Sequence, residues 1–386
     1  MSLIELDNEY VANTYGRFPI EIEKGKGSIL YDKCGKEYID LGSGIGVNAF
    51  GLCDEEWKNA VVSQINKVQH VSNLYYTEPC AKLAELLCKK TGMKKVFFSN
   101  SGAEANECAI KVARKYALEH KGKDYYNIIT LKNGFHGRTI TTLSATGQDC
   151  FHNSFSPFTE GFLYADTNDI YQLEAIVSMH KVGAIMIECI QGEGGVNTLD
   201  AEYIEQLKEF IKFHDLLLIV DEVQTGNGRT GKFYSYMNFG LTPDIVTTAK
   251  GLGGGLPIGA CLMGEKVQNT LKKGDHGSTF GGNPVACAGA ISIVKRIDDI
   301  LPEVIEKSKF VFNELKDEKG IESVSGLGLM IGIKTVKPAS EVLNACIKRG
   351  VLCLTAKNKL RLLPALNIPF DLLKTAIQII KEECAR

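Results

Sequence analysis

An acid and a lysine, each at the end of an apolar run, are the residues best placed to do chemistry. The run Leu217–Val220 leads into Asp221, and Asp244–Thr248 leads through one alanine to Lys250. Ligands of open α/β sheets bind at the carboxyl ends of the strands. Because one intervening segment can bring two strand ends together, this carboxylate and this amine can face one pocket. Taken alone, Asp221 is more typical of a turn.

A glycine-rich turn, Gly251–Gly255, follows the lysine. A P-loop places its lysine after the glycines, so this turn is not one. Glycines here instead leave room for a bulky group bonded to the Lys250 amine. A lysine that forms a Schiff base, with an acid directed at a pyridinium nitrogen, is the pair that pyridoxal phosphate (PLP) requires. Asp221 would keep that nitrogen protonated, and Lys250 would hold the cofactor and shuttle the proton.

A phosphate anchor is the third requirement. Ser101, Gly102 and Ala103 follow an apolar run and open a helical pattern, so their amide groups could bind an anion at a helix N-terminus. Taken alone, the same string is an equally good N-cap. The stretch Gly42–Gly46 resembles a dinucleotide-binding fingerprint, but it lacks the final spacing and a following helix.

Short apolar runs alternate with longer amphipathic ones, which predicts an α/β fold with a mostly parallel sheet flanked by helices. The predicted strands are Lys95–Ser99, Asn127–Leu131, Gly183–Ile190, Leu216–Asp221, Asp244–Thr248 and Gly259–Gly264. The predicted helices are Gly102–Glu119, Ala201–His214 and Asn283–Ile297.

The chain ends differ from this central block and predict a smaller α+β domain built from both. Its predicted strands are Ser28–Tyr31, Glu37–Leu41, Leu329–Lys334 and Leu360–Leu363, and its predicted helices are Pro302–Lys316 and Phe370–Cys384. We therefore expect an N-terminal segment (1–45) that joins the small domain, a large cofactor-binding domain (46–295) and a C-terminal small domain (296–386).

Composition excludes several classes of protein. The 386 residues carry 44 Lys+Arg against 46 Asp+Glu, a balance that argues against a nucleic-acid binder. No apolar run approaches the roughly 20 residues that span a bilayer, and the N-terminus shows no secretory pattern. The 12 scattered cysteines form no Cys-x-x-Cys pair, and no metal-binding spacing is present. We expect a soluble cytoplasmic protein with reduced thiols and no metal.

Strings along nearly the whole chain resemble the class III (fold type I) PLP-dependent aminotransferases, most closely those that act on acetylornithine. The resemblance rests on Asn13–Pro19, Val71–Pro79, Ser101–Asn106, Gly134–Thr139, Glu188–Gly194, Asp221–Gly226, Ala249–Gly251 and Gly277–Pro284. Each string is moderate evidence, and their occurrence in the family's order is strong evidence.

The resemblance implies roles around the cofactor ring. Lys250 would bond to PLP and Asp221 would pair with the pyridine nitrogen. Val223 would pack behind the ring, and Gln224 would approach its phenolic oxygen. Phe135 would stack on the other face, although a core aromatic is the ordinary interpretation of such a residue.

The resemblance also implies a homodimer with active sites at the interface. Gly102 and Ala103, beside Ser101, would hold the phosphate of PLP. Thr279 of the neighbouring subunit would join them, and Ser278 would approach the substrate from across the interface.

Besides Ser278, four residues would take part in substrate binding. Arg138 would bind the α-carboxylate of the amine donor, because a planar guanidinium suits bidentate recognition of a carboxylate. Arg361 would bind the α-carboxylate of the oxo acid, and Glu193 would neutralise Arg361 while the donor is bound. Tyr15 would also contact substrate. Ordinary surface charges are the alternative for Glu193 and Arg361.

The implied reaction transfers the terminal amino group of N-acetylornithine to 2-oxoglutarate, in arginine biosynthesis. The alternatives within the family are amine donors such as succinylornithine, ornithine, 4-aminobutyrate or N-succinyldiaminopimelate, and a mutase acting on glutamate semialdehyde. A cofactor-free structural homologue is the alternative from another class, but intact Lys250 and Asp221 oppose it.

Two sites depart from the family pattern. Gly51–Glu55 replaces a common Gly-His-x-His-Pro string, and Cys189 stands where proline is usual. Neither departure is expected to affect chemistry, but each predicts a local difference in the backbone.

Overall fold

A seven-stranded sheet in the order β4-β12-β11-β10-β7-β5-β6 forms the centre of this computed structural model, which describes all 386 residues. Its strands are β4 (Lys95–Ser99), β5 (Asn127–Leu131), β6 (Phe162–Ala165), β7 (Val182–Ile187), β10 (Leu217–Asp221), β11 (Ile245–Thr248) and β12 (Gly259–Met263). Only β12 runs antiparallel to its neighbours, so the predicted mostly parallel sheet is confirmed.

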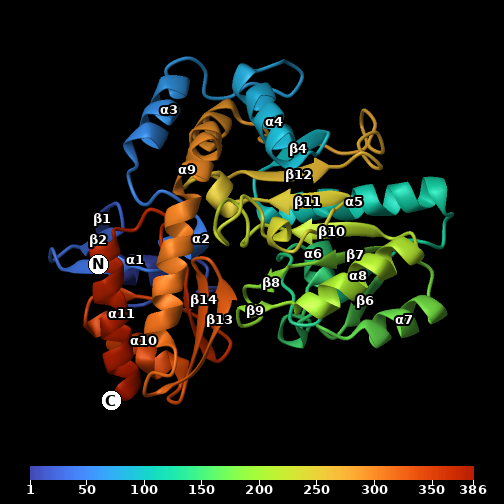
Figure 1. Cartoon of the computed structure of the whole chain (residues 1–386). Helices are drawn as coiled ribbons and strands as arrows, with labels where there is room; N and C mark the ends of the chain where they lie inside the picture. Colours follow the sequence, from blue (N-terminus) through green and yellow to red (C-terminus); the bar gives the residue numbers. More distant parts are fainter.

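Helices cover both faces of this sheet (Figure 1). On one face α5 (Gly102–His120) packs against Leu217 and Ile219, and on the other α8 (Ala201–Phe213) and α7 (Ile170–Met179) share a core with Leu218 and Val220. Successive strand residues point to opposite faces, so both faces need apolar side chains. The ends of the strands are not covered by these helices, so polar residues can stand there.

The two helices predicted at Asn283–Ile297 and Pro302–Lys316 are wrong as separate elements, because α9 runs unbroken from Pro284 to Leu315. Proline inside a helix removes one hydrogen bond and costs about 3 kcal/mol. Buried residues such as Val294 and Val311 lie on both sides of Pro302, so packing along the whole helix outweighs that cost.

Two further four-stranded sheets are built from the chain ends, and the first of them contains strands from both ends. They are β1 (Ile22–Lys26), β2 (Ile29–Asp32), β3 (Glu37–Asp40) and β15 (Val351–Leu352), and β13 (Ile321–Leu327), β14 (Met330–Thr335), β17 (Lys359–Leu362) and β16 (Leu354–Ala356). Ile39 of β3 lies opposite Val351 of β15, so the N-terminal strands and the C-terminal part share one sheet. The boundaries at 45/46 and 295/296 stay predictions, and the second falls inside α9.

The remaining elements are short or peripheral. They are α1 (Leu3–Tyr10), α2 (Ser43–Gly46), α3 (Glu55–Ile65), α4 (Glu78–Thr91), α6 (Ile140–Ala145), η1 (Asp149–Phe151), β8 (Ile190–Gln191), β9 (Asn197–Thr198), η2 (Ser235–Asn238), η3 (Lys250–Leu252), α10 (Ala339–Lys348) and α11 (Phe370–Ala385). No helix has the length and apolar character needed to cross a membrane.

The departure at residues 51–55 builds a helix start. Asp54 caps α3 by accepting a hydrogen bond from the Trp57 amide at 2.9 Å. Its two oxygens also accept from Arg296 of α9, at 2.6 and 3.1 Å. Cys53 just before it has a φ of 54°, in the left-handed region. Cys189, the other departure, is fully buried just after β7.

Candidate active site

The ends of β10 and β11 and the start of α5 open onto one cavity of ≈ 420 Å³. The cavity brings together nine of the predicted site residues. These are Ser101, Gly102, Ala103, Phe135, Arg138, Asp221, Val223, Gln224 and Lys250. Their positions follow from the fold, because adjacent parallel strands end at one edge of the sheet.

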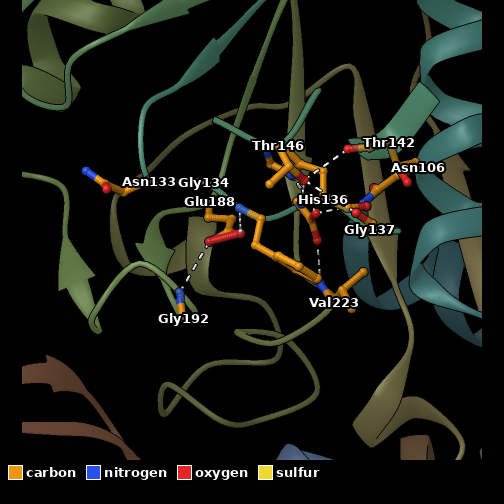
Figure 2. A network of polar contacts seen from close by, with 12 residues as sticks. Asn106, Asn133, Gly134, His136, Gly137, Thr142, Thr146, Glu188, Gly192 and Val223 are labelled. Carbon is orange, nitrogen blue, oxygen red and sulfur yellow. Dashed lines mark hydrogen bonds and ion pairs between the residues drawn. The ribbon is translucent and has the colours of Figure 1, made fainter. Parts of the chain in front are cut away.

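Asp221 is the buried acid of this cavity, and its carboxylate is firmly held. Its Oδ2 accepts from Asn106 Nδ2 at 2.8 Å and lies 2.8 Å from His136 Nδ1, while its Oδ1 accepts from the Val223 amide at 3.0 Å. Figure 2 shows these partners around the strand end. A carboxylate has about four acceptor positions, so one remains for a donor in the cavity.

His136 and Asn106 were missed by the sequence analysis. The His136 amide donates to Thr146 Oγ1 at 3.0 Å, and its carbonyl accepts from Asn106 Nδ2 at 2.7 Å (Figure 2). Burial acts to lower the pKa of His136, but the contact with Asp221 and the Glu188 charge together outweigh burial and raise that pKa. The only sequence signal was the position of His136 between two predicted site residues.

Lys250 lines the same cavity as this acid. Its amine makes no hydrogen bond or ion pair within the chain, and burial, with the nearby Arg361 charge, lowers its pKa. The residue has a φ of 46°, a left-handed conformation that is strained for lysine. A desolvated lysine of lowered pKa is a nucleophilic amine.

The start of α5 faces the same space. Ser101 is its N-cap and accepts a hydrogen bond from the Glu104 amide at 3.2 Å. This hydrogen bond stabilises the first turn of the 19-residue helix. A Cβ at Gly102 would lie 2.6 Å from Val223 Cγ1, so only glycine fits there. A helix N-terminus favours an anion through its free amide groups and its dipole.

Phe135 and Arg138 come from the loop after β5. The Arg138 guanidinium lies 4.1 Å from the centre of the Phe151 ring and 5.5 Å from that of Phe135. Arg138 is exposed and has no acidic partner. Aromatic rings therefore hold this guanidinium at the cavity while its donors stay free for an anion.

Glu193, Gln224 and Arg361 form a second charged group. Arg361 is 3% exposed and its Nη1 donates to Glu193 Oε1 at 2.6 Å and to Gln224 Oε1 at 3.1 Å. Gln224 Nε2 donates to Glu193 at 3.2 Å. Burial acts to raise the pKa of Glu193, but the charge and hydrogen bond of Arg361, the Lys250 charge and the Gln224 hydrogen bond together outweigh it and lower that pKa. The structure thus brings the two predicted partners into contact.

Glu188 is a further buried acid of the cavity that the sequence analysis did not select. It stands directly after β7 and is 9% exposed. Burial raises its pKa to about 8. Its carboxylate accepts hydrogen bonds from the amides of Phe135 and Gly192, at 3.1 and 3.2 Å.

Five predicted residues lie outside the cavity lining: Glu193 and Arg361, which contact Gln224 of the lining, and Ser278, Thr279 and Tyr15. Ser278 Oγ accepts from the side chain of Asn100, which lines the cavity, at 3.2 Å. Thr279 is exposed. Tyr15 is 69% exposed and lies beside Arg17 in the N-terminal segment. Their roles stay predictions, and those of Ser278 and Thr279 need a second subunit.

The family model described as aminotransferase class-III matches residues 10–383. This chain belongs to the class III aminotransferases. Two relatives are the acetylornithine aminotransferases of Haemophilus ducreyi, 48% identical over 98% of this chain and 97% of that protein, and of Aquifex aeolicus, 45% identical over 97% and 99%. The class III assignment agrees with the resemblance that the motifs carry.

Solved aminotransferase structures share the fold. An N-acetylornithine aminotransferase from Stenotrophomonas maltophilia is 35% identical with a TM-score of 0.86, covering 99% of this chain and 98% of that one. The ornithine aminotransferase from Toxoplasma gondii is 31% identical with a TM-score of 0.95, covering 99% and 94%. The predicted fold type is therefore confirmed.

PLP is the cofactor of this aminotransferase family, and the residues present fit it. The amine of Lys250 has no partner within the chain, Asp221 keeps an acceptor position free, and the start of α5 offers amide groups in the same cavity. A covalent attachment point, a partner for the ring nitrogen and an anion site are the three groups that PLP needs.

Proposed function

We propose that this enzyme transfers the terminal amino group of N2-acetyl-L-ornithine to 2-oxoglutarate, giving N-acetyl-L-glutamate 5-semialdehyde and L-glutamate, as a step of arginine biosynthesis. The observation that carries this assignment is the presence of two unequal arginines near Lys250. Arg361 is covered by Glu193, whereas Arg138 is free. A two-substrate pocket that must bind different carboxylates in turn requires such a difference.

The chain's own residues supply attachment, orientation and proton transfer. When bound, PLP supplies a cationic ring that withdraws electrons from the carbon that loses its proton. Lys250 would hold the cofactor and then move that proton, because its lowered pKa favours the neutral amine. Asp221 would keep the ring nitrogen protonated, fixed in place by Asn106 and His136.

The faces and the phosphate of the cofactor would be held by the cavity walls. Phe135 would cover one face of the ring and Val223 the other, while Gln224 would approach the phenolic oxygen. The phosphate would lie at the start of α5, near Gly102 and Ala103.

Recognition of the two substrates would alternate between the arginines. Arg138 would bind the α-carboxylate of acetylornithine while Glu193 neutralises Arg361, so that no second carboxylate is attracted. Glu193 would then move away and let Arg361 bind the α-carboxylate of 2-oxoglutarate. A planar guanidinium recognises carboxylates in a bidentate manner in both steps.

A homodimer would complete the site, with Thr279 reaching the partner's phosphate and Ser278 the partner's substrate. Exposed apolar side chains near Ser278 and Thr279 support the homodimer, since Leu74, Tyr75 and Phe280 are 85%, 70% and 60% exposed. Exposed apolar side chains gathered on one face mark interaction sites. A cytoplasmic location also stays a prediction.

The test is a panel of amine donors with 2-oxoglutarate, in which glutamate formation is measured. We expect acetylornithine to have the highest kcat/KM among acetylornithine, succinylornithine, ornithine, 4-aminobutyrate and N-succinyldiaminopimelate. Ornithine is the second candidate, because the Toxoplasma gondii ornithine aminotransferase shares the fold at a TM-score of 0.95. If ornithine clearly had the highest kcat/KM, ornithine would replace acetylornithine as the assigned amine donor.

A further inference from the structure

Glu188 is a buried acid to which the proposed reaction gives no role. It lies at the end of β7, and its two carboxylate oxygens accept from two different loops. Oε1 accepts from the Phe135 amide at 3.1 Å, and Oε2 accepts from the Gly192 amide at 3.2 Å (Figure 2). Because both contacts are to backbone, Glu188 fixes the course of each loop.

Each of these loops carries a residue of the substrate cycle. The loop held through Oε1 contains Phe135 and Arg138, which would cover the cofactor ring and bind the donor. The loop held through Oε2 leads directly from Gly192 to Glu193, the partner of Arg361. Glu188 therefore joins the donor side of the cavity to the group that covers Arg361.

The second loop is also packed tightly beyond its hydrogen bond. A Cβ on Gly192 would overlap the side-chain amide of Gln224, which itself contacts both Glu193 and Arg361. A shift of the Gly192 backbone would therefore displace Gln224 and change the pairing of Glu193 with Arg361.

We propose that Glu188 is a positioning residue that holds the Phe135–Arg138 loop and the Gly192–Glu193 loop at a fixed separation, so that Glu193 covers Arg361 while Arg138 holds the amine donor. The expected effect on the two half-reactions rests on the proposed function, whereas the expected effect on the two loops does not. Glu188 acts through the two loops that it holds and does not contact the atoms that react.

Glu188→Gln tests this idea with almost no change in shape. Whether or not it is protonated, the carboxyl group has lone pairs on both oxygens and can accept both backbone N–H groups, whereas the NH₂ group of glutamine is only a donor and faces one of them. Glu222→Gln is the matched control. Glu222 is also a fully buried acid at a strand end, but it accepts from Thr225, Ser235 and the Tyr236 amide and does not line the cavity.

The first measurement is hydrogen exchange of the holoenzyme without substrate, followed by mass spectrometry on peptides that contain Phe135 or Gly192. Loss of a hydrogen bond to a buried carboxylate should speed exchange of at least one of these amides by about tenfold. Glu222→Gln should leave both peptides unchanged. Equal protection in Glu188→Gln and wild type would overturn the proposal, whatever the amine donor is.

The second measurement is single-turnover kinetics of the two half-reactions. We expect Glu188→Gln to lower kcat/KM for acetylornithine about tenfold, since both loops act in the donor half. The 2-oxoglutarate half should change by less than about threefold, because Arg361 itself is intact. Equal losses in both halves would contradict a positioning role. If the wild type prefers another donor, the same comparison applies to that donor.

Discussion

The Glu193 carboxylate accepts a hydrogen bond from Arg361 Nη1 at 2.6 Å, although 168 positions separate the two residues in the chain. Gln224 bonds to both and closes a three-membered group at the cavity. Glu193 occupies Nη1 and neutralises the guanidinium charge, so Arg361 attracts a second carboxylate only weakly until Glu193 moves. Movement of Glu193 is therefore the step that would admit the oxo acid.

Arg361→Ala should damage the 2-oxoglutarate half-reaction more than the acetylornithine half. Removing one partner of a buried, hydrogen-bonded charge pair costs roughly 2–5 kcal/mol. We expect kcat/KM for 2-oxoglutarate to fall at least about 30-fold, measured by single-turnover reaction of the amino form of the enzyme. An equal fall in both halves would rule out the switching scheme.

Arg138→Ala should give the opposite pattern. Its guanidinium is free of acidic partners and is held only by aromatic rings, so its loss should leave folding nearly unchanged. We expect KM for acetylornithine to rise about tenfold or more, with partial recovery in Arg138→Lys, because lysine keeps the charge but not the planar fork. Unchanged KM for acetylornithine would remove Arg138 from donor recognition.

Lys250→Ala should abolish covalent attachment of the cofactor. Borohydride treatment of the yellow wild-type enzyme should bleach it and add the cofactor mass to the peptide that contains Lys250. Lys307→Gln is the control, since Lys307 is another buried lysine but pairs with Glu303 far from the cavity lining. Labelling of any other lysine would overturn the assignment.

Asp54→Ala should lower the free energy of unfolding by roughly 2 kcal/mol, because it removes both the N-cap of α3 and the contact with Arg296. The two side chains are only 18% and 17% exposed. Asp54→Asn should lose less, roughly 1 kcal/mol, since asparagine can still cap the helix. Urea unfolding of the two variants measures the difference, and equal losses would show that the cap contributes nothing.

The Glu188 carboxyl should make stability fall as pH rises. Burial raises its pKa to about 8 in the folded chain, so the folded state binds its proton more tightly than the unfolded state. This stabilisation is complete below the ordinary glutamate pKa and is lost as pH approaches 8. The charges of His136 and Lys250 act to lower the pKa of Glu188 and that of Asp221 acts to raise it, with burial the largest contribution.

The measurement is urea unfolding of wild type and Glu188→Gln between pH 5 and pH 8. We expect the wild type to lose more unfolding free energy over this range, by an amount on the order of 1 kcal/mol or more. Parallel stability curves for the two proteins would mean that Glu188 does not titrate as described.

Sequence reasoning reached the residues that strand ends and helix starts position. Asp221, Lys250 and Ser101 each follow an apolar run, and such runs end at a common edge when the sheet is parallel. The contact of Arg361 with Glu193 was expected only from the family resemblance, because no local pattern links residues so far apart.

The residues that were missed depend on contacts between loops. Asn106, His136 and Glu188 are ordinary members of a helix or a loop until the fold closes. Glu188 lies 53 positions from Phe135, and Asn106 lies 115 positions from Asp221. The prediction of two helices separated near Pro302 was wrong for a related reason. The packing that keeps α9 continuous is not visible in the local sequence.

The pairing of β3 with β15 also constrains how the chain can mature on the ribosome. Lys36 beside β3 reaches the carbonyl of Lys348, which is synthesised 312 residues later. At about 5–20 residues per second, the opening strands wait on the order of 15 seconds to a minute for their partner. During translation the first sheet therefore has an unpaired edge, and molecular chaperones have time to bind it before the last segment emerges.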